Sequence, residues 1–491
     1  MSLNDQQVDQ IARRVVQYMA AGGAPVAPPP PIACGEAQRA PKVEAPSAAG
    51  VPGVFAELDS AVNAAAQAFR ELDGMSVAVR EKIIQSIRDA MLQHGESLAR
   101  EAHEETGLGR WQDKVIKNRL VTLKTPGLED LTPEVRTGDR GMTLTERAPF
   151  GVIAAVTPST NPTSTIICNT IGMVAAGNAV VFNVHPAARK VSVRNVALIN
   201  EAIIRAGGPR NLVTTLTNPT IESAQALMKH PGVRLLVVTG GPGVVEAAMQ
   251  SGKRAICAGP GNPPVVVDET ADIAQAARDT VKGASFDNNV ICTDEKEAFV
   301  VSSAADDFLR AMGQNGALVL NRTQAKQIDN VIFKETRGPR QSSVVDRTLI
   351  GKNAGVILAK AGINVGDDIR LAVMEVDANH PLVWTEQLMP VFPVVRVSSA
   401  DEAIDLAVAA EGGRRHTAAM HSRNIDKLSR MARLINCSIF VKNGPCYAGL
   451  GEGGEGYTSF SIASPTGEGM TGPHSFTRYR RCVLVDHFRI V

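Results

Sequence analysis

The sequence predicts an α/β fold built around a doubly wound parallel sheet of the nucleotide-binding type. Short apolar runs rich in valine are separated by helical stretches, and the runs lie at residues 151–158, 178–184, 211–216, 233–241 and 263–268. Strands that are apolar on both faces and alternate with helices are typical of a parallel sheet covered on both sides. A second strand–helix series follows residue 292, and a chain of 491 residues is long enough for two or three domains.

The N-terminal segment differs from this body. Residues 4–19 carry Val8, Ile11, Val15 and Met19 on one face of an amphipathic helix, and residues 21–51 are rich in Pro, Ala and Gly, as extended linkers are. Such a helix either docks back onto its own chain or presents its apolar stripe to a groove on another protein. The length of the linker favours the second interpretation.

Composition excludes several classes of protein. Lys plus Arg number 51 against 50 Asp plus Glu, so a basic nucleic-acid-binding surface is not expected. No apolar run is long enough to span a membrane, and the start, MSLNDQQVDQ, is not built like a secretory signal. Seven scattered cysteines with no CxxC pair argue against disulfides and a metal site. We therefore expect a reducing, cytoplasmic location.

Two glycine-rich segments are candidates for binding phosphate. Gly240, Gly241 and Gly243 follow a valine-rich strand and precede a helix that begins near Val244, but Glu246 replaces the last glycine of a dinucleotide fingerprint. A tight turn would also use glycine, yet the surrounding strand–helix alternation favours cofactor binding. The segment 451–456, GEGGEG, opens no helix after a buried strand, so we expect a mobile loop there.

Cys292 is the candidate nucleophile. The polar residues SFDNN precede it and TDEKE follows it, so the thiol lies at a boundary between elements, where access is easier than in a packed strand. On its own this position is equally compatible with a small core residue. Of the other cysteines, Cys446 in NGPCYAG is expected near the substrate entrance and is the one rival nucleophile.

The order of several motifs resembles the aldehyde dehydrogenase superfamily, and more narrowly its CoA-acylating branch. These motifs are TPSTNPTS at 157–164, VVFNVHPAAR at 180–189, VVTGGPG at 237–243, AGPGNPP at 258–264, the cysteine at 292 and EQLMPVFPVV at 386–395. The resemblance extends from about residue 52 to the end. The N-terminal helix and linker resemble those of the microcompartment propionaldehyde and acetaldehyde dehydrogenases, in which such a helix is an encapsulation peptide.

The resemblance implies roles for individual residues. Cys292 would attack the aldehyde, and its own backbone N–H together with Asn161 or Thr160 would stabilise the oxyanion. Glu386 would contact the nicotinamide ribose, with a surface acid as the alternative. His185 and His416 would contact cofactor or CoA, or would serve packing or helix capping. The expected cofactor-binding residues are Thr157, Pro158, His185, Pro186, Thr239, Gly240, Gly241, Gly243, Gly259, Gly261 and Glu386.

One departure from the superfamily predicts the acyl acceptor. Hydrolytic members carry a glutamate that activates water, whereas the stretch ICAGPGNPP has Cys257 and Ala258 at that place. Without a positioned base, water is a poor acceptor, and the thiol of CoA needs less activation. The expected products are therefore acyl-CoA and NADH from a short aliphatic aldehyde, with propionaldehyde ranked before acetaldehyde. A hydrolytic enzyme and a catalytically silent assembly protein are the alternatives, and NADP stays open as the cofactor.

The resemblance also implies the domain organisation. Residues 1–20 would be the targeting helix and 21–51 the linker, 52–131 with 149–262 the NAD-binding domain, and 263–465 the catalytic domain. Residues 132–148 and 466–491 would form a small β oligomerisation element, in which the tail strand pairs elsewhere in the fold or across a subunit interface. We expect a homo-oligomer, either a dimer or a tetramer, inside a bacterial microcompartment, with a shell protein bound by residues 4–19.

Overall fold

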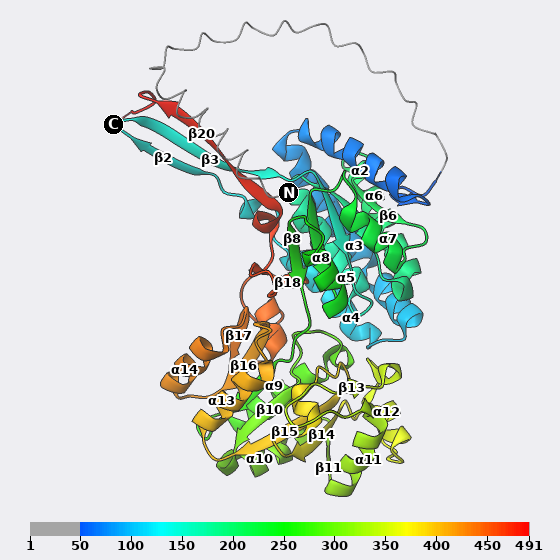
Figure 1. The fold of residues 1–491 in the computed structure, drawn as a ribbon, viewed down its shortest axis with the longest axis vertical. Coiled ribbons are helices and arrows are strands. Elements are labelled where there is room, and N and C mark those ends of the chain that lie inside the picture. The colour runs from blue at the N-terminus through cyan, green and yellow to red at the C-terminus, as the bar shows by residue number, and fades with distance from the viewer. Residues whose placement is uncertain (1–49, 491) are drawn as a thin grey trace, which may run out of the picture. The chain divides into compact units, whose positions relative to one another are not determined.

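A computed structural model describes residues 50–490, so the helix expected at 1–20 and nearly all of the linker lie outside the described residues. The described chain is an α/β protein with two large parallel sheets and three small antiparallel ones (Figure 1). This architecture confirms the predicted fold class. None of the described helices is both long enough and apolar enough to cross a membrane.

The first sheet contains the predicted valine-rich strands. Its strand order is β1-β6-β5-β4-β7-β8, and every neighbouring pair is parallel. The chain winds outward from β4 in one direction through β5 and β6, and then crosses to the other side of β4 through β7 and β8. The strands are β1 (Val54–Phe55), β4 (Val152–Val156), β5 (Ala179–Asn183), β6 (Val213–Leu216), β7 (Leu235–Thr239) and β8 (Ala255–Ala258).

Helices pack around this sheet, and one of them is completely buried. Every residue of α5 (Pro162–Ala175) is buried, because β5 lies on one side of it and α3 (Val77–Thr106) and α4 (Trp111–Lys124) lie on the other. The Thr, Ser, Cys and Gly residues in its sequence TSTIICNTIG are small and allow this close packing on all sides. The remaining helices of this part are α2 (Leu58–Asp73), α6 (Arg189–Arg205), α7 (Ile221–Lys229) and α8 (Pro242–Met249).

The second sheet has the order β11-β14-β15-β10-β9-β16-β17 and is also parallel throughout. The run at 263–268, which we grouped with the first series, forms β9 (Pro264–Val267) near the middle of this second sheet. A short apolar run carries no information about which sheet it joins, and pairing with β10 (Glu297–Val301) decides it here. The other strands are β11 (Ala317–Leu320), β14 (Leu371–Val376), β15 (Val391–Val397), β16 (Thr417–His421) and β17 (Ile439–Lys442).

Two apolar cores flank the second sheet. Alternate residues of β9 and β10 face α9 (Ile273–Ala284) and α10 (Ser302–Gln314) on one side, and α13 (Ala400–Glu411) and α14 (Ile425–Ile435) on the other. Two further helices, α11 (Arg322–Ile332) and α12 (Ala354–Lys360), cover β11 and β14. The short antiparallel pairs are β12 (Phe333–Glu335) with β13 (Val344–Val345), and β18 (Ile462–Ala463) with β19 (Gly469–Met470).

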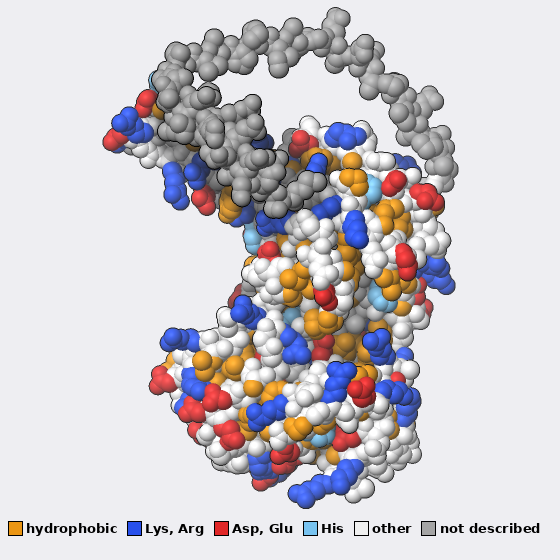
Figure 2. Space-filling model, in the orientation of Figure 1, with side chains coloured by type: hydrophobic (Ala, Val, Ile, Leu, Met, Phe, Trp, Pro, Cys, Tyr) orange, Lys and Arg blue, Asp and Glu red, His pale blue; other side chains and the backbone are white. Residues whose placement is uncertain are grey.

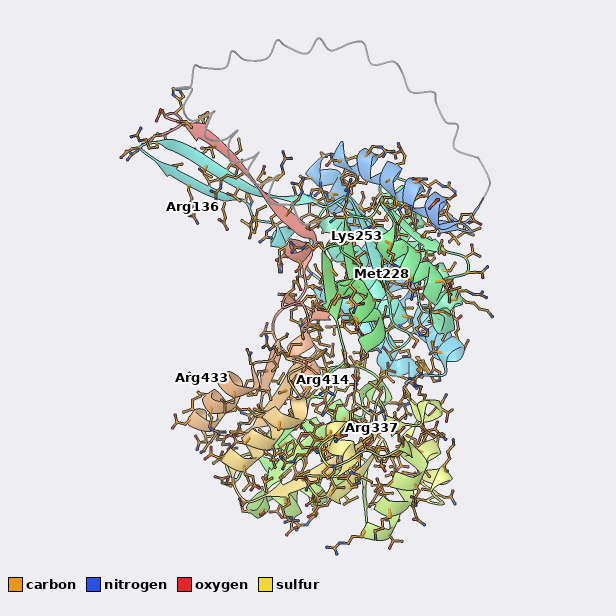
Figure 3. The ribbon with its side chains drawn as sticks, viewed as in Figure 1. Arg136, Met228, Lys253, Arg337, Arg414 and Arg433 are labelled. Carbon is orange, nitrogen blue, oxygen red and sulfur yellow. The ribbon has the colours of Figure 1, made fainter. Side chains whose placement is uncertain are left out.

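A three-stranded antiparallel sheet projects from the body (Figure 1). The predicted hairpin is β2 (Glu134–Gly138) with β3 (Gly141–Pro149), and the tail strand β20 (Thr477–Val485) pairs with β3 of the same chain over its full length. Arg136 of β2 lies on this arm (Figure 3). Most side chains of β20 are exposed, including those of Tyr479, Val483 and Val485.

Charges of both signs are interspersed on the face of the molecule drawn in Figure 2, and Lys and Arg form no continuous patch among the described residues of that face. This agrees with the near balance of charge in the sequence.

Replacing Phe299 by alanine tests the core of the second sheet. Phe299 lies on β10, fully buried against α13 and α14. We expect F299A to lower the free energy of unfolding by about 3–5 kcal/mol, because the substitution leaves a cavity in a packed core. Urea unfolding followed by circular dichroism measures this loss. V319A on the edge strand β11, where the side chain is 37% exposed, is the control and should cost less than about 1 kcal/mol.

Candidate active site

A cavity of about 800 Å³ lies at the carboxyl ends of β4, β5 and β7. The direction of winding reverses on either side of β4, so this cavity lies at the topological switch point of the first sheet. Ligands of open α/β sheets bind in the crevice outside the carboxyl ends of the strands at such a point. Its volume falls within the range of small-molecule and cofactor sites.

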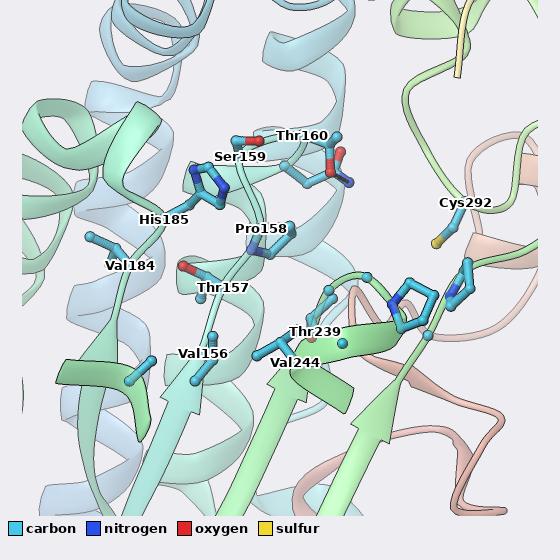
Figure 4. A pocket seen from close by; sticks show the side chains of 18 of the residues that line it. Val156, Thr157, Pro158, Ser159, Thr160, Val184, His185, Thr239, Val244 and Cys292 are labelled. Atoms are coloured by element: carbon cyan, nitrogen blue, oxygen red, sulfur yellow. Dashed lines mark hydrogen bonds between the residues drawn. The ribbon is translucent and has the colours of Figure 1, made fainter. Parts of the chain in front are cut away.

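The cavity brings together nearly all of the predicted site residues. Those that line it are Thr157, Pro158, Thr160, Asn161, His185, Pro186, Thr239, Gly240, Gly241, Gly243, Gly259, Cys292 and Glu386. In Figure 4, Cys292 lies on a loop facing the segment that carries Ser159 and Thr160, and His185 lies on the far side of that segment. Gly261 does not line the cavity. Its backbone N–H instead donates to Glu386 Oε1 at 3.0 Å.

Glycines 241 and 243 leave space where a dinucleotide phosphate would approach. A Cβ atom added to either residue would meet nothing within 4 Å, and α8 begins between them at Pro242. The N-terminus of a helix offers unpaired N–H groups and a partial positive charge to an anion. Glu246, which replaces the last fingerprint glycine, is exposed and pairs with Gln250. The residues present therefore fit a dinucleotide.

The cysteine loop has an unusual backbone. Cys292 follows η3 (Phe286–Asn289), in which Asp287, Asn288 and Asn289 have φ angles of 45°, 55° and 66°. Asp and Asn tolerate this left-handed region better than other non-glycine residues, which explains the sequence DNN. We expected the flanking polar residues to form a surface loop, but residues 287–289 and 293–297 are almost completely buried. Many of their polar groups are paired within the protein, whereas Thr293 Oγ1 and one carboxylate oxygen each of Asp294, Glu295 and Glu297 are buried without a hydrogen-bond partner.

Lys296 fixes the loop before Cys292 through hydrogen bonds to its backbone. Its Nζ donates to the carbonyl oxygens of Asn289 and Ile291 at 3.1 and 3.0 Å, and to Asn289 Oδ1 at 2.6 Å. Gln387 Nε2 in turn donates to the carbonyl oxygen of Lys296 at 3.0 Å. These contacts fix the backbone directly before Cys292.

The thiol of Cys292 is neutral in the resting protein. Burial raises its pKa to about 12, the carboxylate of Glu386 adds to the rise, and Lys296 opposes it. Burial also raises the pKa of Glu386, whose carboxyl accepts the Gly261 N–H. The sequence predicted surroundings that favour the thiolate, and in this state only Lys296 and the backbone N–H of Cys292 itself do so.

A buried charge cluster on α4 was missed by the sequence analysis. Lys114 and Lys117 both pair with Asp287 Oδ2, the former at 2.9 Å, and all three side chains are 3% exposed or less. Burial alone would raise the pKa of Asp287, but the two lysines hold it below its ordinary value. Asp113 accepts the backbone N–H of Asp287 at 2.9 Å and pairs with Arg370 at 2.9 Å. The spacing of residues 113, 114 and 117 put them on one helix face, but that face would ordinarily be assigned to solvent.

The cluster distinguishes between the two candidate oxyanion donors. Asn161 Oδ1 accepts from Lys117 Nζ at 2.6 Å, which leaves Nδ2 as the amide's donor, and Nδ2 lies 3.2 Å from Thr160 Oγ1. Thr160 Oγ1 is thus an acceptor in this state, and its backbone carbonyl faces Lys114 at 3.4 Å. The geometry favours Asn161 over Thr160 as the donor.

Other candidates lie away from the cavity. Cys446, expected near the substrate entrance, is completely buried at the start of η6 (Cys446–Leu450), belongs to the apolar core of the second sheet and does not line the cavity. His416 is also buried and does not line the cavity; burial lowers its pKa to about 3, its Nδ1 lies 2.9 Å from Thr417 Oγ1 and its Nε2 has no hydrogen-bond partner, so the choice between contact with cofactor or CoA and packing stays a prediction. The 451–456 loop is held by Lys124, whose Nζ donates to the carbonyls of Gly451 and Gly454 at 2.5 and 3.0 Å.

The structure also shows the place at which hydrolytic enzymes of the resembled superfamily carry their water-activating glutamate. Cys257 and Ala258 end β8, both are buried, and neither lines the cavity. Among the described residues that do line it, Glu386 has the only carboxylate and Arg347 the only guanidinium, while burial lowers the pKa of the third titratable side chain besides Cys292, that of His185. Arg347, in η4 (Arg347–Leu349), was not identified from the sequence, because no motif surrounds it.

Removing the charge of Glu386 should make Cys292 more reactive. We expect E386Q to lower the thiol pKa and so to raise the rate of alkylation by iodoacetamide several-fold at any pH between 7 and 10. In the wild type, the rate should rise about tenfold per pH unit over this range, because a thiol with a pKa near 12 is mostly protonated throughout. Mass spectrometry of the Cys292 peptide measures both effects.

E375Q is the matched control, since Glu375 on β14 is paired with Arg396 and has no part in the Cys292 pKa. A wild-type rate that levels off below pH 8 would contradict the neutral resting thiol.

The sequence matches known proteins over almost its whole described length. The profile of the aldehyde dehydrogenase family matches residues 53–461. The chain is 56% identical over 440 residues to the acetaldehyde dehydrogenase (acetylating) EutE of Salmonella typhimurium, covering 89% of this chain and 94% of that protein. It is 51% identical over 490 residues to EutE of Escherichia coli, covering 100% of both chains.

Solved structures agree with these matches. A propionaldehyde dehydrogenase of Rhodopseudomonas palustris, with bound CoA and an acylated cysteine, has a TM-score of 0.85 at 50% identity, covering 88% of this chain and 98% of that one. A propionaldehyde dehydrogenase from the fucose utilisation microcompartment of Clostridium phytofermentans has a TM-score of 0.87 at 46% identity, covering 90% and 100%. With two parallel sheets, a switch-point cavity and a cysteine facing it, the chain belongs to the aldehyde dehydrogenase family.

Proposed function

We propose that this protein oxidises a short aliphatic aldehyde with NAD and CoA, giving acyl-CoA and NADH through a thioester on Cys292. One observation carries the proposal. Cys292 and Asn161 line the same dinucleotide-sized cavity, in which Glu386 is the only lining carboxylate among the described residues. A nucleophile and an oxyanion donor are thus available, whereas a separate base for activating water is not.

In the first half of the reaction, the Cys292 thiol releases its proton to solvent, the resulting thiolate attacks the aldehyde carbonyl carbon, and the carbonyl oxygen takes the negative charge. Asn161 Nδ2 and the backbone N–H of Cys292 are the donors for this oxyanion. Bound NAD supplies the hydride acceptor, held by the glycines around α8 and by Glu386. Loss of hydride from the former aldehyde carbon leaves a thioester on Cys292.

In the second half, the acyl group must pass to an acceptor. Attack by water needs a general base at the thioester, and Glu386 accepts a hydrogen bond from Gly261 on the cofactor side of the cysteine. The thiol of CoA is more acidic and more nucleophilic than water, so it takes the acyl group without such a base, while the Cys292 sulfur leaves and regains a proton. The Rhodopseudomonas palustris structure has bound CoA and an acylated cysteine, which supports this order of events.

The comparisons support acetaldehyde as the first choice of substrate. The relatives at 56% and 51% identity are both named acetaldehyde dehydrogenase (acetylating), whereas the two solved structures at 50% and 46% identity are propionaldehyde dehydrogenases. Propionaldehyde, which the sequence analysis ranked first, becomes the second candidate.

We also propose that residues 4–19 address the enzyme to a microcompartment shell protein in the cytoplasm, and that the β2-β3-β20 arm joins subunits of a dimer or tetramer. The targeting segment lies outside the described residues. Its support is the amphipathic pattern of the sequence and the microcompartment origin of one structural neighbour. Exposed apolar side chains on β20 support the assembly role of the arm. The domain boundaries given above remain part of the same proposal.

Omitting CoA should abolish most of the activity. We expect NADH formation from acetaldehyde to fall at least about a hundredfold without CoA, because the Cys292 thioester then has no efficient acceptor. Absorbance at the NADH band, with C2 to C4 aldehydes, measures this and ranks the substrates. C292A should be inactive with every aldehyde, and C482A, on the exposed arm, is the matched cysteine control. Undiminished NADH formation without CoA would establish the hydrolytic alternative instead.

Deleting residues 1–20 should separate localisation from catalysis. We expect the truncated protein to keep its activity in solution, because the cavity is built from residues 156–462, and to lose co-sedimentation with purified microcompartment shells. Retained co-sedimentation would contradict the targeting role.

A further inference from the structure

We infer that Lys117 is a positioning residue for the oxyanion donor: its buried ammonium captures the amide oxygen of Asn161 and so directs Nδ2 toward the reacting carbonyl at Cys292. This inference rests on the proposed function. It names a residue on α4, outside every motif of the sequence, and assigns it a part in the same reaction.

Asn161 stands at a helix start without capping it. It is the N-cap residue of α5, a position at which an asparagine oxygen ordinarily accepts a backbone N–H from the first turn. Here its side chain makes no such bond, and its Oδ1 accepts from Lys117 Nζ at 2.6 Å instead. The Asn161 side chain therefore does not cap α5, the role that its position favours, and it lines the cavity instead.

An ammonium determines the orientation of the amide. Lysine only donates, so the atom of Asn161 that faces Nζ must be the oxygen, and Nδ2 must face the other way. A water molecule or a hydroxyl could bond either end of the amide. With Lys117 in place, the side chain presents Nδ2, which carries two N–H groups: one donates to Thr160 Oγ1 at 3.2 Å, and the other is the donor for an oxygen that is gaining negative charge.

Lys117 is itself held in place. Its side chain is 2% exposed and pairs with Asp287 Oδ2, on the η3 turn that leads to Cys292. The Asp287 carboxylate therefore fixes Lys117, and Asp287 itself belongs to the turn that leads to Cys292. In a buried site, such an ion pair moves less than water would, so the donor needs little reorganisation during the reaction.

Lys114 provides a built-in comparison. It is equally buried and pairs with the same Asp287 oxygen at 2.9 Å, but it faces the backbone carbonyl of Thr160 and makes no contact with the Asn161 amide. A change at Lys114 disturbs the same ion cluster without removing the amide's partner.

A double-mutant cycle tests the inference. The variants are K117M, N161A and the double variant, and the rate measured is acylation of Cys292 by p-nitrophenyl acetate, followed as the burst of p-nitrophenolate without NAD or CoA. N161A should lose about 10²–10³-fold and K117M about ten- to a hundredfold. In the N161A background, K117M should change the rate less than about threefold, because the amide through which it acts is gone.

The parallel cycle with K114M should be additive within about twofold, since Lys114 does not act through Asn161. Alkylation of Cys292 by iodoacetamide forms no oxyanion, so K117M should leave its rate within about twofold of the wild type. If K117M does not fold, as judged by circular dichroism, K117Q replaces it in the same cycle.

Two results would overturn the inference. One is an equal loss from K117M in the wild-type and N161A backgrounds, and the other is an equal loss in the alkylation reaction. The C292A variant distinguishes this failure from a failure of the proposed function. A burst that persists in C292A would show that Cys292 is not the nucleophile.

Discussion

The arrangement of the candidate site depends on one buried carboxylate, that of Asp287. It accepts from Arg110 N–H at the start of α4, pairs with Lys114 and Lys117 on that helix, and lies in the left-handed turn before Cys292. Through Lys117 it also reaches Asn161 at the start of α5. The cofactor sheet supplies α5, while the cysteine precedes a strand of the second sheet, so this ion cluster sets the distance between the reacting groups of two separately built cores. Removing Asp287 would leave two buried cations without their partner, a far larger cost than the loss of one surface ion pair.

The alternation of apolar strands and helices predicted four of the six strands of the first sheet, β4, β5, β6 and β7, because burial on both faces leaves a signal in local composition, and it missed the short edge strands β1 and β8. It did not predict that 263–268 would join the second sheet, since only the pairing of β9 with β10 determines that. The motifs predicted which residues face the cavity, from Thr157 to Glu386, and the choice between Thr160 and Asn161 needed the position of Lys117. A buried charge such as Lys117 resembles a solvated one in sequence, and only tertiary structure distinguishes them.

The chemistry of the site follows from a balance of opposed charges. Burial and Glu386 keep the Cys292 thiol protonated, while Lys296 and the backbone N–H favour its ionised form. A nucleophile that is neutral until its partners arrive is protected from adventitious alkylation and oxidation, since the thiolate is the reactive species. The cavity thus combines a protonated thiol with an amide, that of Asn161, whose oxygen is held by Lys117.

The pairing of β3 with β20 has a consequence for how the chain is made. Pro149 of β3 pairs with Thr477 of β20, 328 residues later in the chain (477 − 149). At the usual ~5–20 residues per second, a ribosome needs roughly 15–65 s to supply that partner. During this interval one edge of β3 is an unpaired strand that neighbouring nascent chains can pair with. Pairing of β20 therefore closes this edge of β3, and removing β20 would expose the edge without touching the cavity, whose lining residues end at Ile462.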